Sequence, residues 1–432
     1  MLPIFTDCRF SVKRWVNQGP TNKMNIIQFA FRNVFRNRRR SLITLLAIAV
    51  GFMAINLFGG YIARIFDGME EGAIYGEGLG HLTIFKQGFL IEGKVDPAKY
   101  MISADEMAAL TTLIASNPAI EKVIPKMGVA GLISNGTSST IFIADSMTAA
   151  DFAFLNADYA YTGEGTRITA DKPIGVQVGS DLAKMMRVQV GDTLPVMANT
   201  LDGQMNALDV EVAGIYNTGS DATNDKYLLM PLELAQSLYD TTAVDRVSLI
   251  LSNVSQTEPV RAWLAAQLPQ INFQADVKSW NELSVFFTKV KNLMNVIFIF
   301  IFSIVLVIVV IGVINTMTMS VVERTQEIGT LRALGLRRRD VLRIFGAEGF
   351  MLGVLGVVFG TLGTVIVTVL INVANISYFP PGVAEAVPIE VAFAPVTVLA
   401  SGVFLALLSW GAAIFPSFKA SRLRIVDAFG HV

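Results

Sequence analysis

The chain contains four long runs without Asp, Glu, Lys or Arg. They contain 23, 31, 36 and 28 residues, and each has an apolar core. A helix needs about 20 apolar residues to cross the ~30 Å hydrocarbon core of a bilayer. The runs therefore predict four transmembrane helices, at residues 41–65, 289–320, 346–373 and 391–416.

Residues 66–288, between the first two predicted spans, show a different pattern. Helical spacing of apolar residues at Ala104–Ser116 alternates with short segments that predict strands. The charge-free stretch Met127–Ala144 predicts a hairpin with its turn at Asn135-Gly136. This mixture indicates an α+β domain of ordinary size.

Charge is unevenly distributed along the chain. The net charge is −1, but residues 66–288 hold 13 basic and 27 acidic residues (net −14), and the remainder holds 21 basic and 8 acidic ones (net +13). Basic residues cluster before span 1, between spans 2 and 3, and after span 4. The positive-inside rule then places both termini in the cytoplasm and residues 66–288 outside. The predicted fold class is an α-helical membrane protein with four transmembrane helices plus a large α+β extracytoplasmic domain between spans 1 and 2.

The remaining segments are the two termini and the loop between the last two spans. Residues 1–40 form a cytoplasmic N-terminus, in which residues 25–40 have the pattern of an amphipathic helix lying on the membrane surface. The alternative is a helical extension of span 1. An uncleaved anchor is favoured over a signal peptide because 40 residues precede the span, and Met24 is an alternative start to Met1. Residues 374–390 form a short outer loop and 417–432 a cytoplasmic C-terminus.

Span 2 has a helical pattern that is too long for the membrane alone. It continues from Ser279 to about Ser320, roughly 60 Å at 1.5 Å per residue, which is about twice the hydrocarbon thickness. We expect span 2 to continue outward as a rigid stalk. The alternative is a break near Lys289–Asn292.

Few residues are suited to catalysis or metal binding. There is one cysteine, Cys8, and there are two histidines, His81 and His431. These numbers disfavour a Cys- or His-based metal site and a Ser-His-Asp triad. No set of catalytic residues and no bound cofactor is predicted. A nucleic-acid-binding patch is not predicted either, because the basic residues flank apolar runs.

The loop at 321–345 is longer than a simple connection requires. It predicts a short helix over Glu323–Ala333 that stops at Gly335. Glu323 and Glu327 share one helical face, and the small Gly329 and Ala333 would let a cytoplasmic partner approach. The alternative is a positively charged segment that only sets the membrane orientation.

The segment ERTQEIGTLRALG in this loop resembles the signature of the FtsX-like permeases of ABC transporters, the MacB/LolC/LolE superfamily. Nine of its positions match: Glu323, Arg324, Glu327, Ile328, Gly329, Leu331, Arg332, Ala333 and Gly335. A looser resemblance to the LolC/LolE branch rests on Thr218, Gly219, Asp225, Pro231, Leu232, Ala235 and Gln236.

The resemblance implies a machine in the bacterial inner membrane. Such permeases pair as dimers, with a second copy or a paralogue, and each subunit rests on a cytoplasmic ATPase that uses ATP and Mg²⁺. The matched segment would be the coupling helix, and residues 66–288 would be periplasmic. The chain has no G-x-x-x-x-G-K-[ST] loop, so it is not expected to be an enzyme by itself.

The resemblance leaves three functions open. The first is release or extrusion of lipoproteins or another amphiphile. The second is MacB-like efflux of peptides or small molecules with a periplasmic adaptor. The third is FtsX-like mechanotransmission that activates a cell-wall hydrolase. A periplasmic chaperone is a further partner that the first function implies.

Span 3 carries glycines at steps of three and four residues, which places them on one helical stripe. Such a stripe is typical of close helix packing in lipid, the alternative being incidental glycine enrichment. Glu348, near the cytoplasmic end of this span, is expected in a solvated interfacial position. The stripe consists of Gly346, Gly349, Gly353, Gly356, Gly360 and Gly363.

Overall fold

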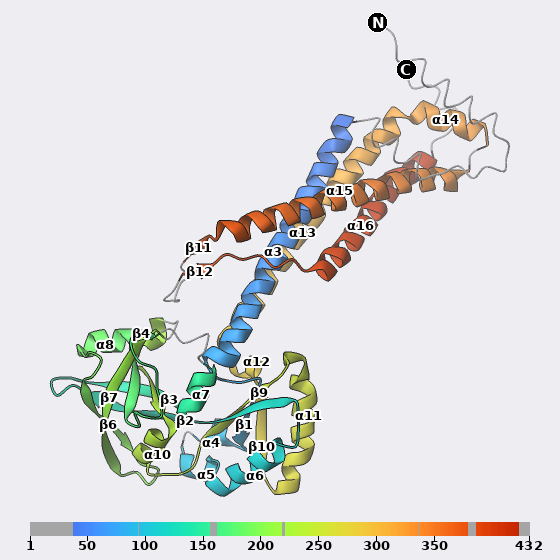
Figure 1. Cartoon of the computed structure of the whole chain (residues 1–432). Coiled ribbons are helices and arrows are strands. Elements are labelled where there is room, and N and C mark those ends of the chain that lie inside the picture. The colour runs from blue at the N-terminus through green and yellow to red at the C-terminus, as the bar shows by residue number, and fades with distance from the viewer. Residues whose placement is uncertain are drawn as a thin grey trace. The chain divides into compact units, whose positions relative to one another are not determined.

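The computed structural model describes residues 38–93, 95–155, 162–217, 221–335, 337–378 and 386–422. It divides into two compact units, whose elements are labelled in Figure 1. The predicted surface helix, apart from its last three residues, and the C-terminal residues 423–432 lie outside the described part of the chain. The helical unit comprises the described residues of Met1–Ile62, Asn295–Ala374 and Glu390–Val432, and the α/β unit comprises those of Ala63–Met294 and Asn375–Ile389.

Four helices are long and apolar enough to cross a membrane, and each contains most of one predicted span. The third begins at Arg338, before the predicted start at residue 346. The predicted span began after the arginine-rich segment 337–343, whereas arginine is a good helix former. Asp340 lies in the first turn of this helix, where a carboxylate is favourable. The four are α3 (Arg38–Glu71), α13 (Val285–Glu323), α15 (Arg338–Ala374) and α16 (Pro395–Ser421).

One apolar cluster holds the four long helices of the helical unit together. α13 contributes Val305, Val309, Val313 and Met317, which are buried and recur every fourth residue. Its other faces are apolar but exposed, as at Phe300, which is 66% exposed. A helix that is apolar all round and packed along one stripe suits a lipid environment.

The glycine stripe of α15 contacts two helices of the same chain. A Cβ added at Gly349 would lie 2.2 Å from Cβ of Ala413 on α16, and one at Gly356 would lie 2.4 Å from Cγ2 of Ile48 on α3. These distances leave no room for a side chain, so the glycines set how closely the helices approach. Gly346 and Gly353 also contact α16, and Gly360 and Gly363 also contact α3.

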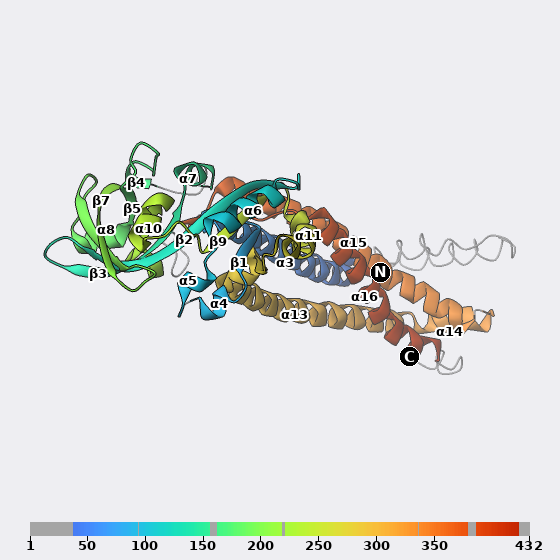
Figure 2. The same cartoon turned by 90° about the horizontal axis from the view of Figure 1, so that it is seen from below.

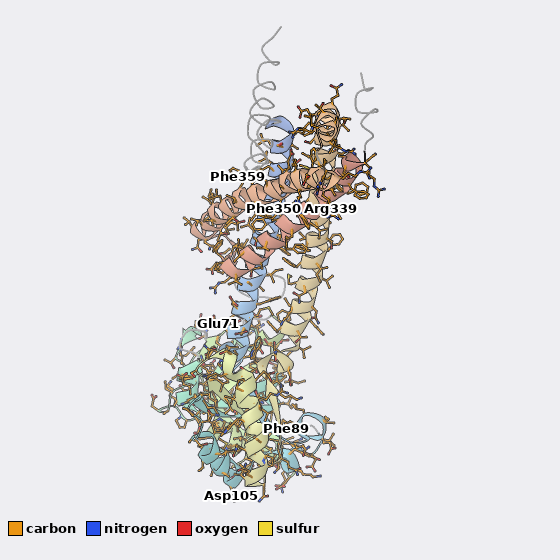
Figure 3. All side chains as sticks on the ribbon, turned by 90° about the vertical axis from the view of Figure 1, so that its right-hand side faces the viewer. Glu71, Phe89, Asp105, Arg339, Phe350 and Phe359 are labelled. Atoms are coloured by element: carbon orange, nitrogen blue, oxygen red, sulfur yellow. The ribbon has the colours of Figure 1, made fainter. Side chains whose placement is uncertain are left out.

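Another side of α15 is exposed. Figure 3 labels Arg339 at the start of this helix and Phe350 and Phe359 further along it. The two phenylalanines are 40% and 51% exposed. α15 therefore combines a small-residue packing stripe with a bulky apolar side.

The α/β unit is built on a ten-stranded sheet. Its strands are β1 (Leu82–Lys86), β2 (Ile120–Ser134), β3 (Ser139–Met147), β4 (Thr162–Gly165), β5 (Gly175–Gly179), β6 (Thr193–Asn199), β7 (Met205–Tyr216), β8 (Tyr227–Pro231), β9 (Arg246–Leu251) and β10 (Ala275–Ser279). The order is β10-β1-β9-β2-β3-β8-β5-β7-β4, and β6 pairs with β2 and β7. The predicted hairpin joins β2 and β3: Gly136 has φ +83°, and Asn135 Oδ1 accepts a hydrogen bond from the Ser138 N–H at 2.8 Å.

Short helices complete this unit. They are α4 (Phe89–Glu92), α5 (Pro97–Tyr100), α6 (Ala104–Ile114), α7 (Ala149–Leu155), α8 (Ser180–Met186), α9 (Asp221–Asn224), α10 (Leu232–Tyr239), α11 (Thr257–Gln267) and α12 (Trp280–Leu283), and a separate two-stranded sheet pairs β11 (Ser377–Tyr378) with β12 (Val387–Pro388). The sequence signal for α6 is its capping box, in which Ser103 Oγ accepts from the Glu106 N–H and the Glu106 carboxylate accepts from the Ser103 N–H.

Strand β2 is shared by two lobes of the sheet. Its residues 120–126 pair with β9, and its residues 127–134 pair with β3. Figure 2 shows β2 running from β9 toward β3. The first lobe comprises β1, β9, β10 and residues 120–126 of β2, with α6 and α11. The second lobe comprises residues 127–134 of β2 and strands β3 to β8, with α8 and α10.

The predicted stalk begins later than the sequence pattern indicated. Ser284, with ψ 87°, separates α12 from α13, so the long helix begins at Val285 rather than at Ser279. It then continues without interruption through residues 289–292. Within the α/β unit, the ring of Phe287 contacts Trp280 at 4.6 Å and Phe66 of α3 at 5.9 Å between centroids. These aromatic contacts join the ends of the two long helices to α12, which directly follows strand β10.

Candidate functional site

A short helix, α14 (Thr325–Ala333), occupies the predicted coupling loop between α13 and α15. The backbone leaves helical geometry at Arg324, with φ −110° and ψ 17°, so α14 is separate from α13. It ends at Gly335, whose φ of +102° lies in the left-handed region that favours glycine. The Gly335 N–H donates to the Arg332 carbonyl at 3.1 Å, which closes the last turn.

The inward side of α14 packs on the chain itself. Ile328 is buried in a cluster with Val321 of α13, Val341 and Phe345 of α15, and Ala420 of α16. Gly329 is buried as well. The expectation that Gly329 opens a surface to a partner is therefore wrong, because this chain already covers it; Ala333 is exposed.

Arg324 and Glu348 form a buried ion pair beneath α14. Arg324 Nη1 lies 3.6 Å from Glu348 Oε2, and the two side chains are 6% and 5% exposed. Ser320 Oγ of α13 lies 3.4 Å from Glu348 Oε1 as a hydrogen-bond donor. The expected solvated position of Glu348 is therefore wrong. A buried carboxylate is tolerated here because a guanidinium and a hydroxyl lie beside it.

A second ion pair joins α3 to the end of α13. Arg40 Nη1 lies 2.7 Å from Glu323 Oε1, and both side chains are more than a third exposed. The hydroxyls of Thr44, one turn further along α3, and Thr316, two turns back along α13, form a buried hydrogen bond between the same helices. Through these contacts, the residues leading into α14 are connected to α3 as well as to α15 and α16.

The outward side of α14 carries exposed residues. Gln326, Thr330 and Ala333 are exposed and fall on one helical line. Leu334, just after the helix, is a large apolar residue that is 58% exposed. The other matched residues, Glu327, Leu331 and Arg332, are partly buried along the edges of the helix. The outward face thus combines Gln326 and the smaller Thr330 and Ala333 with one apolar side chain, Leu334.

The nine matched residues therefore fall into two groups. Arg324, Ile328 and Gly329 are buried and hold α14 on the helical unit, while the others are at least partly accessible. Sequence reasoning missed the Arg324–Glu348 pair. The burial of Glu348 could have been predicted from the helical period, because Glu348 lies on the same side of the helix as the buried Phe345 and Leu352.

Metal-binding side chains do not gather in the part of the chain that the structure describes. No group of three or more His, Cys, Asp or Glu side chains there is placed to hold a metal ion.

Comparison with protein families gives two matches that together span most of the chain. The MacB-like periplasmic core domain matches residues 41–267, and the FtsX-like permease C-terminal region matches residues 299–425. The first match alone covers more than half of the chain. The resemblance found in the loop motif is thereby confirmed.

Individual relatives are distant. The pyoverdine export ATP-binding/permease protein PvdT of Pseudomonas fluorescens (strain Pf0-1) is 26% identical over 428 residues, covering 94% of this chain and 59% of PvdT. LolC, the lipoprotein-releasing system transmembrane protein of Xylella fastidiosa (strain Temecula1), is 23% identical, covering 59% of this chain and 64% of LolC. The uncharacterized ABC transporter permease YknZ of Bacillus subtilis is 25% identical, covering 76% and 82%. The chain thus spans about three-fifths of the length of PvdT.

Among solved structures, the periplasmic region of MacB from Actinobacillus actinomycetemcomitans is similar with a TM-score of 0.35 and 12% identity. That likeness covers 49% of this chain and 92% of the MacB region.

Proposed function

Because this chain belongs to the family of FtsX-like permeases with a MacB-like periplasmic core domain, we propose that it is the membrane subunit of an ABC transporter. In this proposal, α14 receives movement from a separate cytoplasmic ATPase that binds ATP and Mg²⁺. The observation that carries the proposal is the two-sided character of α14. Its inward side is fixed to three helices, and its outward side is exposed.

This arrangement suits the transfer of force. A push on the outward face of α14 acts on α13 and α15 through Ile328 and through the Arg324–Glu348 pair, since both are packed without solvent. α13 then continues as one helix of 39 residues. The α/β unit would respond on the periplasmic side of the inner membrane. A second copy or a paralogue would complete a dimer, in which each subunit carries its own ATPase.

The docking role predicts that Thr330→Arg abolishes binding of the ATPase. A long charged side chain in the middle of the outward line would clash with a closely fitted partner, and we expect at least a tenfold loss of co-purified ATPase. The matched control is Thr112→Arg on α6 of the α/β unit. Both threonines are exposed, and both donate from Oγ1 to the carbonyl four residues earlier at 2.9 Å.

Full retention of a functional complex by Thr330→Arg would contradict docking at α14. Equal loss with Thr112→Arg would instead indicate a general effect of the substitution on the protein.

For the cargo, we propose an amphiphile such as a lipoprotein, released from the outer leaflet of the inner membrane. LolC, by its name, belongs to a lipoprotein-releasing system, and PvdT exports pyoverdine. Both relatives support an exported cargo. MacB-like efflux of peptides with a periplasmic adaptor is the competing proposal.

The cargo proposal predicts selective stimulation of ATP hydrolysis. The complete complex in lipid nanodiscs is titrated with a synthetic triacylated lipopeptide and, as matched control, with the same peptide lacking its acyl chains. We expect the acylated form to raise the rate severalfold and the control to leave it unchanged. Equal stimulation by both peptides would favour peptide efflux over amphiphile release.

A further inference from the structure

Four charged side chains gather where β2 passes from the first lobe of the α/β unit to the second. Lys126 is the last residue of β2 that pairs with β9, where it lies opposite Arg246. Its Nζ lies 2.5 Å from Oδ2 of Asp145 on β3. Arg246 pairs with Asp145 and also with Asp245, whose Oδ2 lies 2.8 Å from Arg246 Nη1. We call Lys126, Asp145, Asp245 and Arg246 the Lys126 cluster.

The cluster also holds the turn that follows α3. Lys126 Nζ donates to the carbonyls of Glu77 and Gly78, both at 3.1 Å. Ser248 Oγ of β9 donates to the Gly78 carbonyl at 3.0 Å. Gly78 has φ +64°, and a Cβ at this position would lie 2.7 Å from Lys126 Nζ. The ammonium group thus fits tightly against the chain just after the first long helix.

Burial makes this arrangement costly. Lys126 is fully buried, and Asp145 and Asp245 are nearly so. Burial lowers the pKa of Lys126, and the carboxylate of Asp145 acts in the opposite direction. The cluster holds two positive and two negative charges, so it is neutral overall. Apolar residues often stabilise a core as well as a buried ion network does, so stability alone does not account for these charges.

The order of the elements along the chain indicates which role the buried charges have. α3 leads into β1 and α13 follows β10, and both strands belong to the first lobe. The second lobe has no such direct connection to a long helix. Asp145, however, belongs to the second lobe, and its carboxylate contacts the same ammonium that holds the turn after α3.

We infer that the Lys126 cluster is a positioning joint that locks the second lobe to the end of α3, so that movement of α3 turns both lobes together. The inference deepens the proposed function, because it supplies the route by which movement from α14 would reach the second lobe. Ion pairs suit this role because charge-assisted hydrogen bonds depend on direction and distance.

The joint is tested by a distance measurement on the full chain in nanodiscs. Spin labels are placed at Gly68→Cys on α3, where an added Cβ meets no atom within 4 Å, and at Gln189→Cys, exposed in the second lobe. Cys8→Ser removes the native thiol. The test variant is Lys126→Met/Asp145→Leu, which removes one charge of each sign and leaves Arg246 with Asp245.

We expect the width of the distance distribution to at least double in the test variant. The apolar cluster that contains Ile74 and Met147 of β3 remains and keeps the second lobe attached, so the α/β unit is expected to fold while the orientation of the second lobe becomes less restricted. The matched control is Lys172→Met/Glu211→Leu, which removes a partly buried ion pair of 2.8 Å from the second lobe and should leave the width unchanged. An unchanged width in the test variant would overturn the joint. If that variant is not recovered folded, Asp145→Asn, which keeps the shape of the side chain, supplies the same comparison.

ATPase binding separates this inference from the proposed function. The test variant leaves α14 intact, so it should co-purify with the ATPase as the unmodified protein does, whereas Thr330→Arg should not. If the test variant leaves the distance distribution unchanged and Thr330→Arg loses ATPase binding as expected, the joint alone is refuted. If the test variant broadens the distance distribution but Thr330→Arg still binds the ATPase fully, the docking role of α14 alone is refuted.

Discussion

Glu348→Leu is expected to destabilise the helical unit by about 3–5 kcal/mol, the usual cost of removing one partner from a buried ion pair. The substitution leaves the guanidinium of Arg324 buried, 6% exposed, without a carboxylate beside it. The measurement is thermal unfolding of the detergent-solubilised protein together with the yield of folded protein.

The double variant Arg324→Leu/Glu348→Leu should regain part of the lost stability, because the buried guanidinium is removed together with the carboxylate. It should nevertheless couple poorly, since α14 would lose its directional link to α15. We expect the ATPase to bind the double variant but to show no response to cargo. Arg40→Ala, which breaks the exposed pair with Glu323, is the control and should cost no more than about 1 kcal/mol. An equal loss of stability in Glu348→Leu and Arg40→Ala would contradict the view that burial decides how much each ion pair contributes to stability.

The spans and the local turns were predictable because their causes are local. Charge-free runs locate membrane helices, and Asn135-Gly136 specifies a tight turn by its own backbone preference. The division of the sheet into two lobes was not predictable in this way. It depends on β1, β9 and β10 meeting from distant parts of the sequence and on β2 changing its partner at Lys126.

Glu348 shows where charge-based reasoning fails. Treating every carboxylate near a membrane boundary as solvated ignores the helical period, which places Glu348 beside buried neighbours. The identity of its partner, Arg324, was beyond sequence reasoning, because the two residues meet only when α13 and α15 pack side by side.

The loop motif has a similar limit. It predicted a set of partner-contacting residues but not which way each of them faces. Ile328 and Gly329 are buried against this chain, whereas Thr330 and Ala333 are exposed. Facing direction depends on the apolar cluster formed with α15 and α16, which a thirteen-residue motif does not contain.

The largest effect on transport is expected from replacing residues 289–292 of α13 with four glycines. The wild-type helix is continuous here, and three of the four residues are exposed, so the change removes little packing. Glycine costs about 1 kcal/mol per residue relative to alanine in a helix, which amounts to roughly 4 kcal/mol over the segment. The glycine variant should still bind the ATPase, because α14 is unchanged, but ATP hydrolysis should no longer drive cargo release.

Four alanines at the same positions provide the matched control. They remove the same side chains, including Lys291, whose Nζ lies 5.5 Å from the ring centroid of Phe287, but they keep the helix. Any difference between the two variants therefore measures helix continuity rather than lost side-chain contacts. We expect release close to the wild-type rate with alanine and near-complete loss with glycine, measured with the reconstituted complex. Equal release by the two variants would show that α13 does not act as a rigid lever, and movement would then have to reach the α/β unit through α3 alone.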